Sequence, residues 1–302
     1  MSGHAALPDD LAAATASADA LRAFLDGLPS TPHDAVVARA EQLAVAPSDP
    51  DDRAALIDIA IGLVDLTTLE AGDTPTKVRE LAQTALRPAP DDPACPHVAA
   101  VCVYPDLVVP VAEVLAGSQV RVASVAGAFP SSRSPLTVKV AEVEAAVAAG
   151  AQEIDCVLDR GAFLDGREHE AFEQLVAMVD ASGDAHVKVI LESAALPDAD
   201  AVRRASWLAV LAGADVVKTS TGKDGPGASL DATLTMLEVA REVGERTGRV
   251  TGVKASGGIR TTDEALGYLA LVRAVGGEDW LVPTRFRFGA SSLVGALVAD
   301  RR

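Results

Sequence analysis

The sequence predicts an α/β protein, a (β/α)8 TIM barrel with an N-terminal helical extension. Three observations lead to this fold. Eight short runs rich in β-branched residues recur along the chain, stretches of helical periodicity separate them, and no GxGxxG sequence follows the first run. The runs comprise residues 60–66, 99–104, 120–126, 153–158, 187–192, 215–220, 251–256 and 285–290.

Each run is apolar almost throughout, which is typical of parallel strands that are buried on both faces. The stretches between the runs are long enough for helices that make right-handed crossovers. A doubly wound open sheet is the alternative fold, but it would normally have fewer strands and a glycine-rich turn after the first one. Eight βα units therefore favour the closed barrel.

Residues 1–53 are rich in alanine and acidic residues and differ in texture from the rest of the chain. We expect two helices there, the second with Thr31 as its N-cap and Pro32 at its first helical position. Residues 54–302 then form the barrel domain, a length that a single α/β barrel commonly reaches.

The chain has 302 residues and a formal net charge of -17. This charge argues against a nucleic-acid partner and against binding to an anionic membrane, since both require a basic surface. No apolar stretch is long enough to span a membrane and the first residues do not resemble a secretion signal, so we expect a cytoplasmic protein. A phosphorylated ligand would need a locally basic pocket.

Cysteine and histidine are sparse and scattered. The three cysteines, Cys95, Cys102 and Cys156, lack paired metal-binding spacing such as CxxC, and no HExxH sequence is present. We therefore expect free thiols and no protein-bound metal.

The basic residues are unevenly divided, with 20 arginines and only 6 lysines. Three of the six lysines, Lys218, Lys223 and Lys254, lie in or beside Gly/Ser/Thr-rich segments that follow strand-like runs. Arginine cannot replace lysine as a nucleophile, because its guanidinium group stays protonated. These positions are therefore candidates for amine chemistry.

Lys218 and Lys254 close the sixth and seventh runs, which are neighbouring strands in a barrel. Two ammonium groups in one partly dehydrated pocket would lower the pKa of at least one of them. Asp155, on the fourth run, could then handle protons. The structural alternatives are a salt bridge for each lysine, and for Asp155 an ion pair with Lys188 or Lys254 inside the barrel.

Two segments, GADVVKTSTGKDG (213–225) and GVKASGGIRT (252–261), resemble the signature segments of the deoxyribose-phosphate aldolases, a family of class I, Schiff-base-forming aldolases. Five further segments, found at 64–74, 101–105, 153–166, 188–196 and 288–293, extend the resemblance in order from about residue 57 to 298. The resemblance implies reversible cleavage of 2-deoxy-D-ribose 5-phosphate to acetaldehyde and glyceraldehyde 3-phosphate, without a metal or organic cofactor.

The resemblance also implies roles for three residues. Lys218 corresponds to the Schiff-base lysine, Lys254 to the auxiliary lysine and Asp155 to the proton-relay acid. Further candidates near this site are Asp65, Cys102 and Thr221. A homodimer or another homo-oligomer is compatible with the sequence, which does not fix the oligomeric state.

The loops after the seventh and eighth runs are candidates for binding phosphate, as they often are in barrels. Glycines allow backbone N–H groups to approach an anion, and hydroxyl and cationic side chains can add donors. The candidate residues are Gly222, Lys223, Gly257, Gly258, Arg260, Ser291 and Ser292. The structural alternative is that these glycines and serines only form strand-to-helix turns and N-caps.

The sequence departs from the family pattern in residues 123–130, which match it only loosely, at Ser193, where threonine is common, and at the C-terminus. Some members end in a tyrosine that assists proton transfer, whereas this chain ends in VADRR and has only Tyr104 and Tyr268. Two other functions remain open: another class I sugar-phosphate aldolase of the barrel type, and a homologue that binds sugar phosphates without catalysis.

Overall fold

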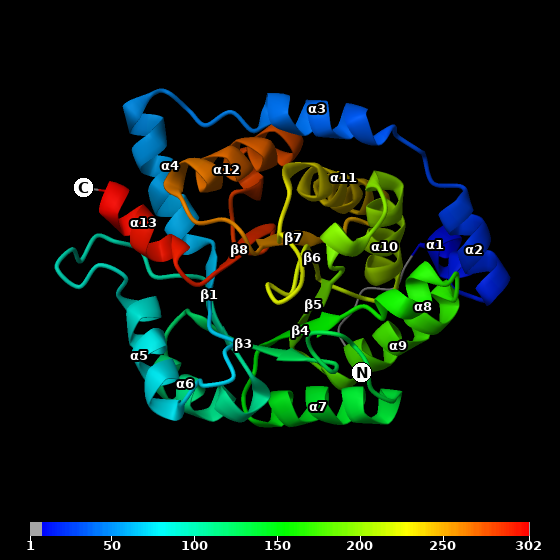
Figure 1. Cartoon of the computed structure of the whole chain (residues 1–302), viewed down its shortest axis with the longest axis horizontal. Helices are drawn as coiled ribbons and strands as arrows, with labels where there is room; N and C mark the ends of the chain where they lie inside the picture. Colours follow the sequence, from blue (N-terminus) through cyan, green and yellow to red (C-terminus); the bar gives the residue numbers. More distant parts are fainter. Residues whose placement is uncertain (1–7, 302) are drawn as a thin grey trace.

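The computed structural model describes residues 8–301, and its centre is a closed barrel of eight parallel strands (Figure 1). Each strand pairs with its neighbours in sequence, and β1 also pairs with β8. The predicted (β/α)8 fold is therefore confirmed. The strands are β1 (Val64–Thr67), β2 (Ala100–Val103), β3 (Arg121–Ala126), β4 (Glu153–Val157), β5 (His186–Ile190), β6 (Val216–Lys218), β7 (Gly252–Ser256) and β8 (Phe286–Ala290).

Helices cover the outside of the barrel, and at least one α-helix separates each strand from the next. The α-helices are α1 (Asp9–Ala14), α2 (Ala18–Asp26), α3 (His33–Leu43), α4 (Pro50–Gly62), α5 (Pro75–Leu86), α6 (Val108–Leu115), α7 (Leu136–Ala148), α8 (Arg160–Leu164), α9 (Glu168–Ala181), α10 (Ala199–Leu211), α11 (Leu230–Thr247), α12 (Thr262–Gly276) and α13 (Leu293–Asp300). Within residues 8–301, no helix is long and apolar enough to cross a membrane.

All eight predicted runs overlap a strand, but the first was placed too early. Residues 60–62, which we expected to open β1, are the last residues of helix α4. The side chains of Ala60 and Ile61 are fully buried, and α4 packs against the neighbouring helices α12 and α13. A continuous apolar run suits the end of a buried helix as well as a buried strand, which explains the error.

The N-terminal region contains more helix than expected. Helices α1, α2 and α3 precede residue 45, where we expected two helices, and α4 runs across the boundary expected at residue 53. The cap of α3 also differs: Pro32 is its N-cap and His33 its first residue, instead of Thr31 and Pro32. The Thr31 amide instead donates to Asp200, on α10, at 3.0 Å.

These N-terminal helices lie against the outer layer of the barrel. Helix α3 runs along the outside of α11 and α12, and α2 contacts α9 and α10 (Figure 1). The Phe24 ring packs edge-on against the Trp207 ring with centroids 5.2 Å apart, and the Arg246 guanidinium lies over both rings. The extension therefore adds a further layer over the helices that follow β5, β6 and β7.

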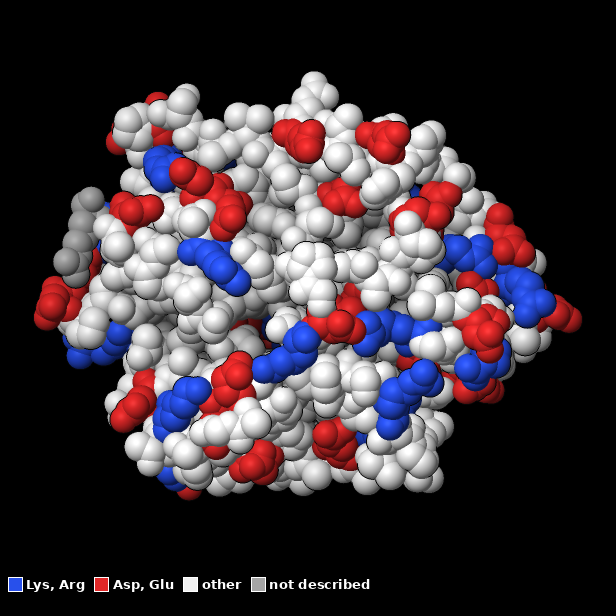
Figure 2. All heavy atoms as spheres, viewed as in Figure 1, with Lys and Arg blue, Asp and Glu red and all other residues white. Residues whose placement is uncertain are grey.

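The barrel interior is divided into an apolar side and a charged side. Leu69, Cys102, Ala123 and Val125 form a small apolar cluster at β2 and β3. Charged side chains from β1, β4, β5, β6, β7 and β8 occupy the remainder and are almost fully buried. On the face shown in Figure 2, acidic and basic side chains are instead interspersed over the surface.

We predict that Phe24→Ala lowers the free energy of unfolding by about 2 kcal/mol, because it removes a partly buried ring and its aromatic contact. Urea denaturation would measure the change. Val45→Ala, at a side chain that is 68% exposed, is the control and should change stability by less than about 0.5 kcal/mol. Equal stability of the two variants would show that α2 does not pack as described.

Candidate active site

Lys218 and Lys254 are directly paired across β6 and β7. Both side chains point into the barrel, where both Nζ atoms donate to Oδ2 of Asp155 on β4, each at 2.8 Å. All three side chains are at most 2% exposed. The structure thus brings together the three residues that the sequence analysis singled out as catalytic candidates.

The other oxygen of Asp155 has a lysine of its own. Lys188, the register partner of Asp155 on β5, donates to Oδ1 at 2.8 Å and lies 2.6 Å from Glu153. The ion pairs considered as structural alternatives for Asp155, with Lys188 and with Lys254, are therefore both present. They do not exclude a chemical role, because Lys218 is held by the same carboxylate.

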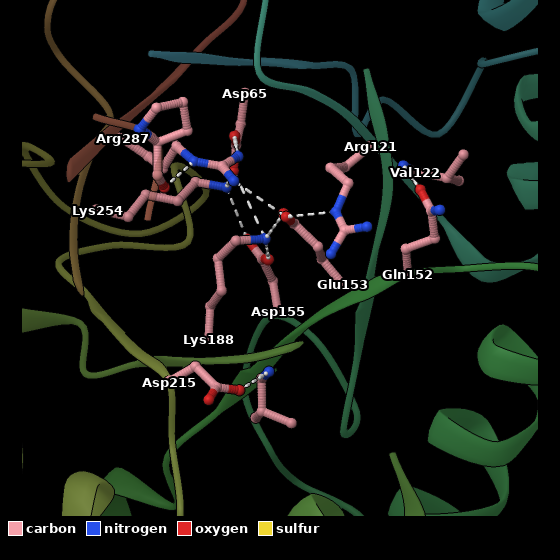
Figure 3. Close-up of polar contacts among 12 residues, drawn as sticks. Asp65, Arg121, Val122, Gln152, Glu153, Asp155, Lys188, Asp215, Lys254 and Arg287 are labelled. Atoms are coloured by element: carbon pink, nitrogen blue, oxygen red, sulfur yellow. Dashed lines mark hydrogen bonds and ion pairs between the residues drawn. The ribbon is translucent and has the colours of Figure 1, made fainter. Parts of the chain in front are cut away.

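Asp65 and Arg287 extend these contacts across the barrel (Figure 3). Asp65, on β1, accepts from Lys254 at 2.6 Å and from the Arg287 guanidinium at 2.6 Å. Arg287, on β8, also donates to Glu153 at 3.0 Å. The interior ion network therefore has four cations and three carboxylates: Lys188, Lys218, Lys254 and Arg287 with Asp65, Glu153 and Asp155.

The two paired lysines have opposite pKa shifts. Burial lowers the pKa of Lys218, and the positive charge of Lys254 adds to this effect, although Asp155 opposes it. Burial also disfavours the charged form of Lys254, but Asp155 and Asp65 together raise its pKa above the ordinary value. Lys218 has one carboxylate partner and Lys254 has two, so Lys218 loses its proton more easily.

Asp155 stays ionised despite complete burial. Burial alone would raise its pKa, but the three surrounding ammonium groups hold the pKa well below its usual value. The pKa of Asp65 is also lowered, since Lys254, Arg287 and Lys188 outweigh the effect of burial. The site therefore contains two permanent carboxylates beside one amine that tends toward the neutral form.

A cavity of about 490 Å³ lies among the loops at the carboxyl ends of β1, β6, β7 and β8. Its walls include every phosphate-site candidate from the sequence, together with Thr221: Gly222, Lys223, Gly257, Gly258, Arg260, Ser291 and Ser292. Ser256 also lines it, two residues beyond Lys254 on the same face of β7. At strand spacing the ion network lies roughly 6–7 Å deeper in the barrel.

The cavity is locally positive although the whole chain is acidic. Three cationic residues line it, Lys77, Lys223 and Arg260, and Glu70 is the one carboxylate on its wall among residues 8–301. Asp73, which forms an ion pair with Lys77, does not line the cavity. Lys223 and Glu70 form an ion pair at 3.0 Å, and both are partly exposed. The cavity therefore has the local charge that we expected a phosphorylated ligand to need in a chain of net charge -17, and phosphate binding there stays a prediction.

Comparison with known proteins assigns the chain to a family. Residues 59–291 match the model of the DeoC/LacD family aldolases. A Caenorhabditis elegans protein provisionally named deoxyribose-phosphate aldolase is 45% identical over 236 residues, which cover 78% of each chain. Human deoxyribose-phosphate aldolase is 37% identical over 273 residues, covering 87% of this chain and 86% of the human protein.

The chain belongs to the DeoC/LacD aldolase family. A solved structure from Coccidioides immitis, also provisionally named deoxyribose-phosphate aldolase, superimposes with a TM-score of 0.73 at 30% identity. It covers 95% of this aldolase and 98% of its own chain, so the similarity extends beyond the barrel into the N-terminal region.

Cys102 lies within the aldolase barrel but does not line the cavity. Burial raises the pKa of its thiol to about 11, and the charge of Asp155 adds to the effect. The thiol therefore keeps its proton at neutral pH. Asp65, another candidate, is likewise absent from the cavity wall and acts inside the barrel as a partner of Lys254.

Glu153 and Arg287 were not predicted as site residues, and Lys188 was considered only as an ion-pair partner. All three point into the barrel from largely apolar strands, at the positions that alternate with outward-facing residues. A charged residue at an inward position of a buried strand is the signal that would have found them. Glu70 was also missed, because it lies in a loop.

We predict that Arg287→Met lowers the free energy of unfolding at pH 7 by about 3–5 kcal/mol, because it takes one buried cation from both Asp65 and Glu153 and upsets the charge balance of the ion network. Arg121→Met is the matched control. The Arg121 side chain is 41% exposed, and its ion pair with Glu153 is long, at 3.7 Å. Its loss should therefore lower the free energy of unfolding by less than about 1 kcal/mol.

The pH dependence of stability tests whether Arg287 acts through its charge. The folded-state pKa of Asp65 lies below its unfolded value, so its stabilisation is full above that value and is lost as the pH falls through the folded pKa. The difference in the free energy of unfolding between wild type and Arg287→Met should therefore be constant above about pH 5 and become smaller below about pH 4. A pH-independent difference would argue for lost packing instead.

Proposed function

We propose that this chain is a deoxyribose-phosphate aldolase, a lyase that reversibly cleaves 2-deoxy-D-ribose 5-phosphate to acetaldehyde and D-glyceraldehyde 3-phosphate. The observation that carries the proposal is the pair of buried lysines that share Asp155, of which only Lys218 has a lowered pKa. The family and the positive cavity support the same substrate class.

Lys218 is the nucleophile. In its neutral form the amine adds to C1 of the open-chain sugar, and loss of water gives an iminium ion that accepts the electrons released in the next step. Desolvation favours the neutral amine, and the charge on Lys254 helps to keep it so. Lys254 remains an ammonium group and forms no bond to the substrate.

Carbon–carbon cleavage requires removal of the proton from the C3 hydroxyl. A water molecule held near Asp155 and Lys254 takes this proton, the C2–C3 bond breaks, and its electrons move into the iminium to form an enamine. Glyceraldehyde 3-phosphate leaves as the aldehyde. Protonation of the enamine at C2 and hydrolysis of the resulting iminium release acetaldehyde and regenerate Lys218.

The cavity holds the phosphate group. The backbone N–H groups of Gly258, Ser291 and Ser292 lie along its walls and have no acceptor among the described residues, and α13 begins directly after Ser292. The N-terminus of a helix and glycine-rich turns attract anions, and Lys223 and Arg260 add charge. The phosphate therefore binds at the mouth of the barrel while the aldehyde reaches the lysines below.

We also propose that the enzyme acts in the cytoplasm as a homo-oligomer. A relative from Aeropyrum pernix, 25% identical with a TM-score of 0.65, is described as a tetramer. The acidic composition supports a small-molecule substrate and no nucleic-acid or membrane partner.

We predict that borohydride reduction in the presence of acetaldehyde adds one ethyl group, at Lys218. Peptide mapping by mass spectrometry would locate the adduct. Lys218→Leu is the control and should take up no label, although Lys254 remains in place. An ethyl group on Lys254 would reverse the roles of the two lysines.

We predict that Lys254→Leu lowers kcat/KM by roughly two to four orders of magnitude, the usual range for loss of an acid–base partner. Loss of the Lys254 charge also raises the pKa of Lys218, since it removes a repulsion and leaves Asp155 with one cation fewer. The acidic limb of the pH profile of kcat/KM should therefore move to higher pH. A near-normal rate with an unmoved profile would reduce Lys254 to a structural ion-pair partner.

A further inference from the structure

We propose that Glu192 is a positioning residue for phosphate binding, which acts by fixing the loop of residues 219–223. This inference rests on the proposed function. Glu192 follows β5, lies outside the ion network, and does not line the cavity. Its effect on the substrate is transmitted through Thr221 and Lys223.

The backbone of Glu192 is strained. Its φ of 53° and ψ of 58° place it in the left-handed region, although it is not a glycine, and only 1% of its surface is exposed. L-residues avoid this region because the Cβ atom crowds the following carbonyl oxygen. Such strain persists where surrounding structure imposes it, commonly beside functional sites.

The backbone around Glu192 is fixed on both sides. The Leu191 amide donates to the Lys218 carbonyl at 2.9 Å, and the Ser193 amide donates to the Thr219 carbonyl at 2.8 Å. These bonds continue the pairing of β5 with β6 beyond the ends of the strands. Glu192 lies between them, beside the loop that carries Thr221 and Lys223.

The Glu192 side chain holds this loop through one oxygen. Its Oε2 accepts from the Thr221 amide at 3.1 Å and from the Thr221 hydroxyl at 2.5 Å. Because a carboxylate only accepts, the hydroxyl proton must point to Glu192, and the lone pairs of the hydroxyl are free to accept elsewhere. The Lys223 amide donates to that hydroxyl at 3.1 Å.

Glu192 therefore determines the path of the chain from Thr221 to Lys223, three residues that all line the positive cavity. Stability alone does not explain the choice of a glutamate. Its other oxygen, Oε1, is buried and has no hydrogen-bond partner among the described residues, which is costly for a carboxylate. The contact between Glu192 and Thr221 is explained by the loop that it orients, residues 221–223.

Glu192→Ala tests the proposal, because it removes both hydrogen bonds and leaves the lysines and Asp155 unchanged. We expect KM for 2-deoxyribose 5-phosphate to rise about tenfold, with kcat within about threefold of wild type. For unphosphorylated 2-deoxyribose, kcat/KM should stay within about twofold. Equal losses on both sugars would assign Glu192 a general structural role and overturn the proposal.

Glu192→Gln is the matched control. Both donors converge on one oxygen, and an amide oxygen can accept the same two bonds, so KM should return to within about twofold of wild type. In a Lys223→Ala background, Glu192→Ala should raise KM by no more than about twofold, because the Lys223 side chain that the loop places in the cavity is already absent. Full additivity would contradict the mechanism.

Glu192→Asp serves if the alanine variant does not fold, because it keeps the charge but shortens the side chain by one methylene. It should show the same selective rise in KM for the phosphorylated sugar, and a change of less than about twofold would overturn the proposal. Failure of wild type to cleave 2-deoxyribose 5-phosphate would instead refute the proposed function.

Discussion

The structure depends on one carboxylate, that of Asp155, which lies between three lysine ammonium groups inside the barrel. Burying these charges is costly, and the cost is met only if the geometry pairs each of them. That geometry requires β4, β5, β6 and β7 to be adjacent and in register, which a closed barrel provides. The asymmetry of partners around Asp155 then makes one lysine more readily neutral than the other.

Much of the fold follows from local pattern. Each strand was found because β-branched runs recur at regular intervals, and the lysine pair was found because Lys218 and Lys254 end consecutive runs. The start of β1 was missed because helix α4 ends in the same kind of apolar residues that begin the strand. The cap at Thr31 was missed because its amide is held by Asp200, a contact 169 residues away.

The contacts of Arg287 and Glu192 could not be predicted for a related reason. Arg287 contacts Asp65 across 222 residues, and this pairing exists only once β1 and β8 close the barrel. Glu192 lies in a segment that we expected to end as a strand, and its left-handed backbone has no signal in the residue itself. Local sequence shows which chemical groups are available, whereas barrel closure decides which of them meet.

The interior ion network also constrains how this sequence can evolve. Asp65, Asp155 and Glu153 each contact at least two cations, and Lys188, Lys254 and Arg287 each contact at least two carboxylates. Exchange of any one of these residues for a neutral one takes a partner from at least two buried charges at once. Drift by single neutral steps is therefore blocked at these positions, and a lineage could replace the network only by changing several strands of the barrel together.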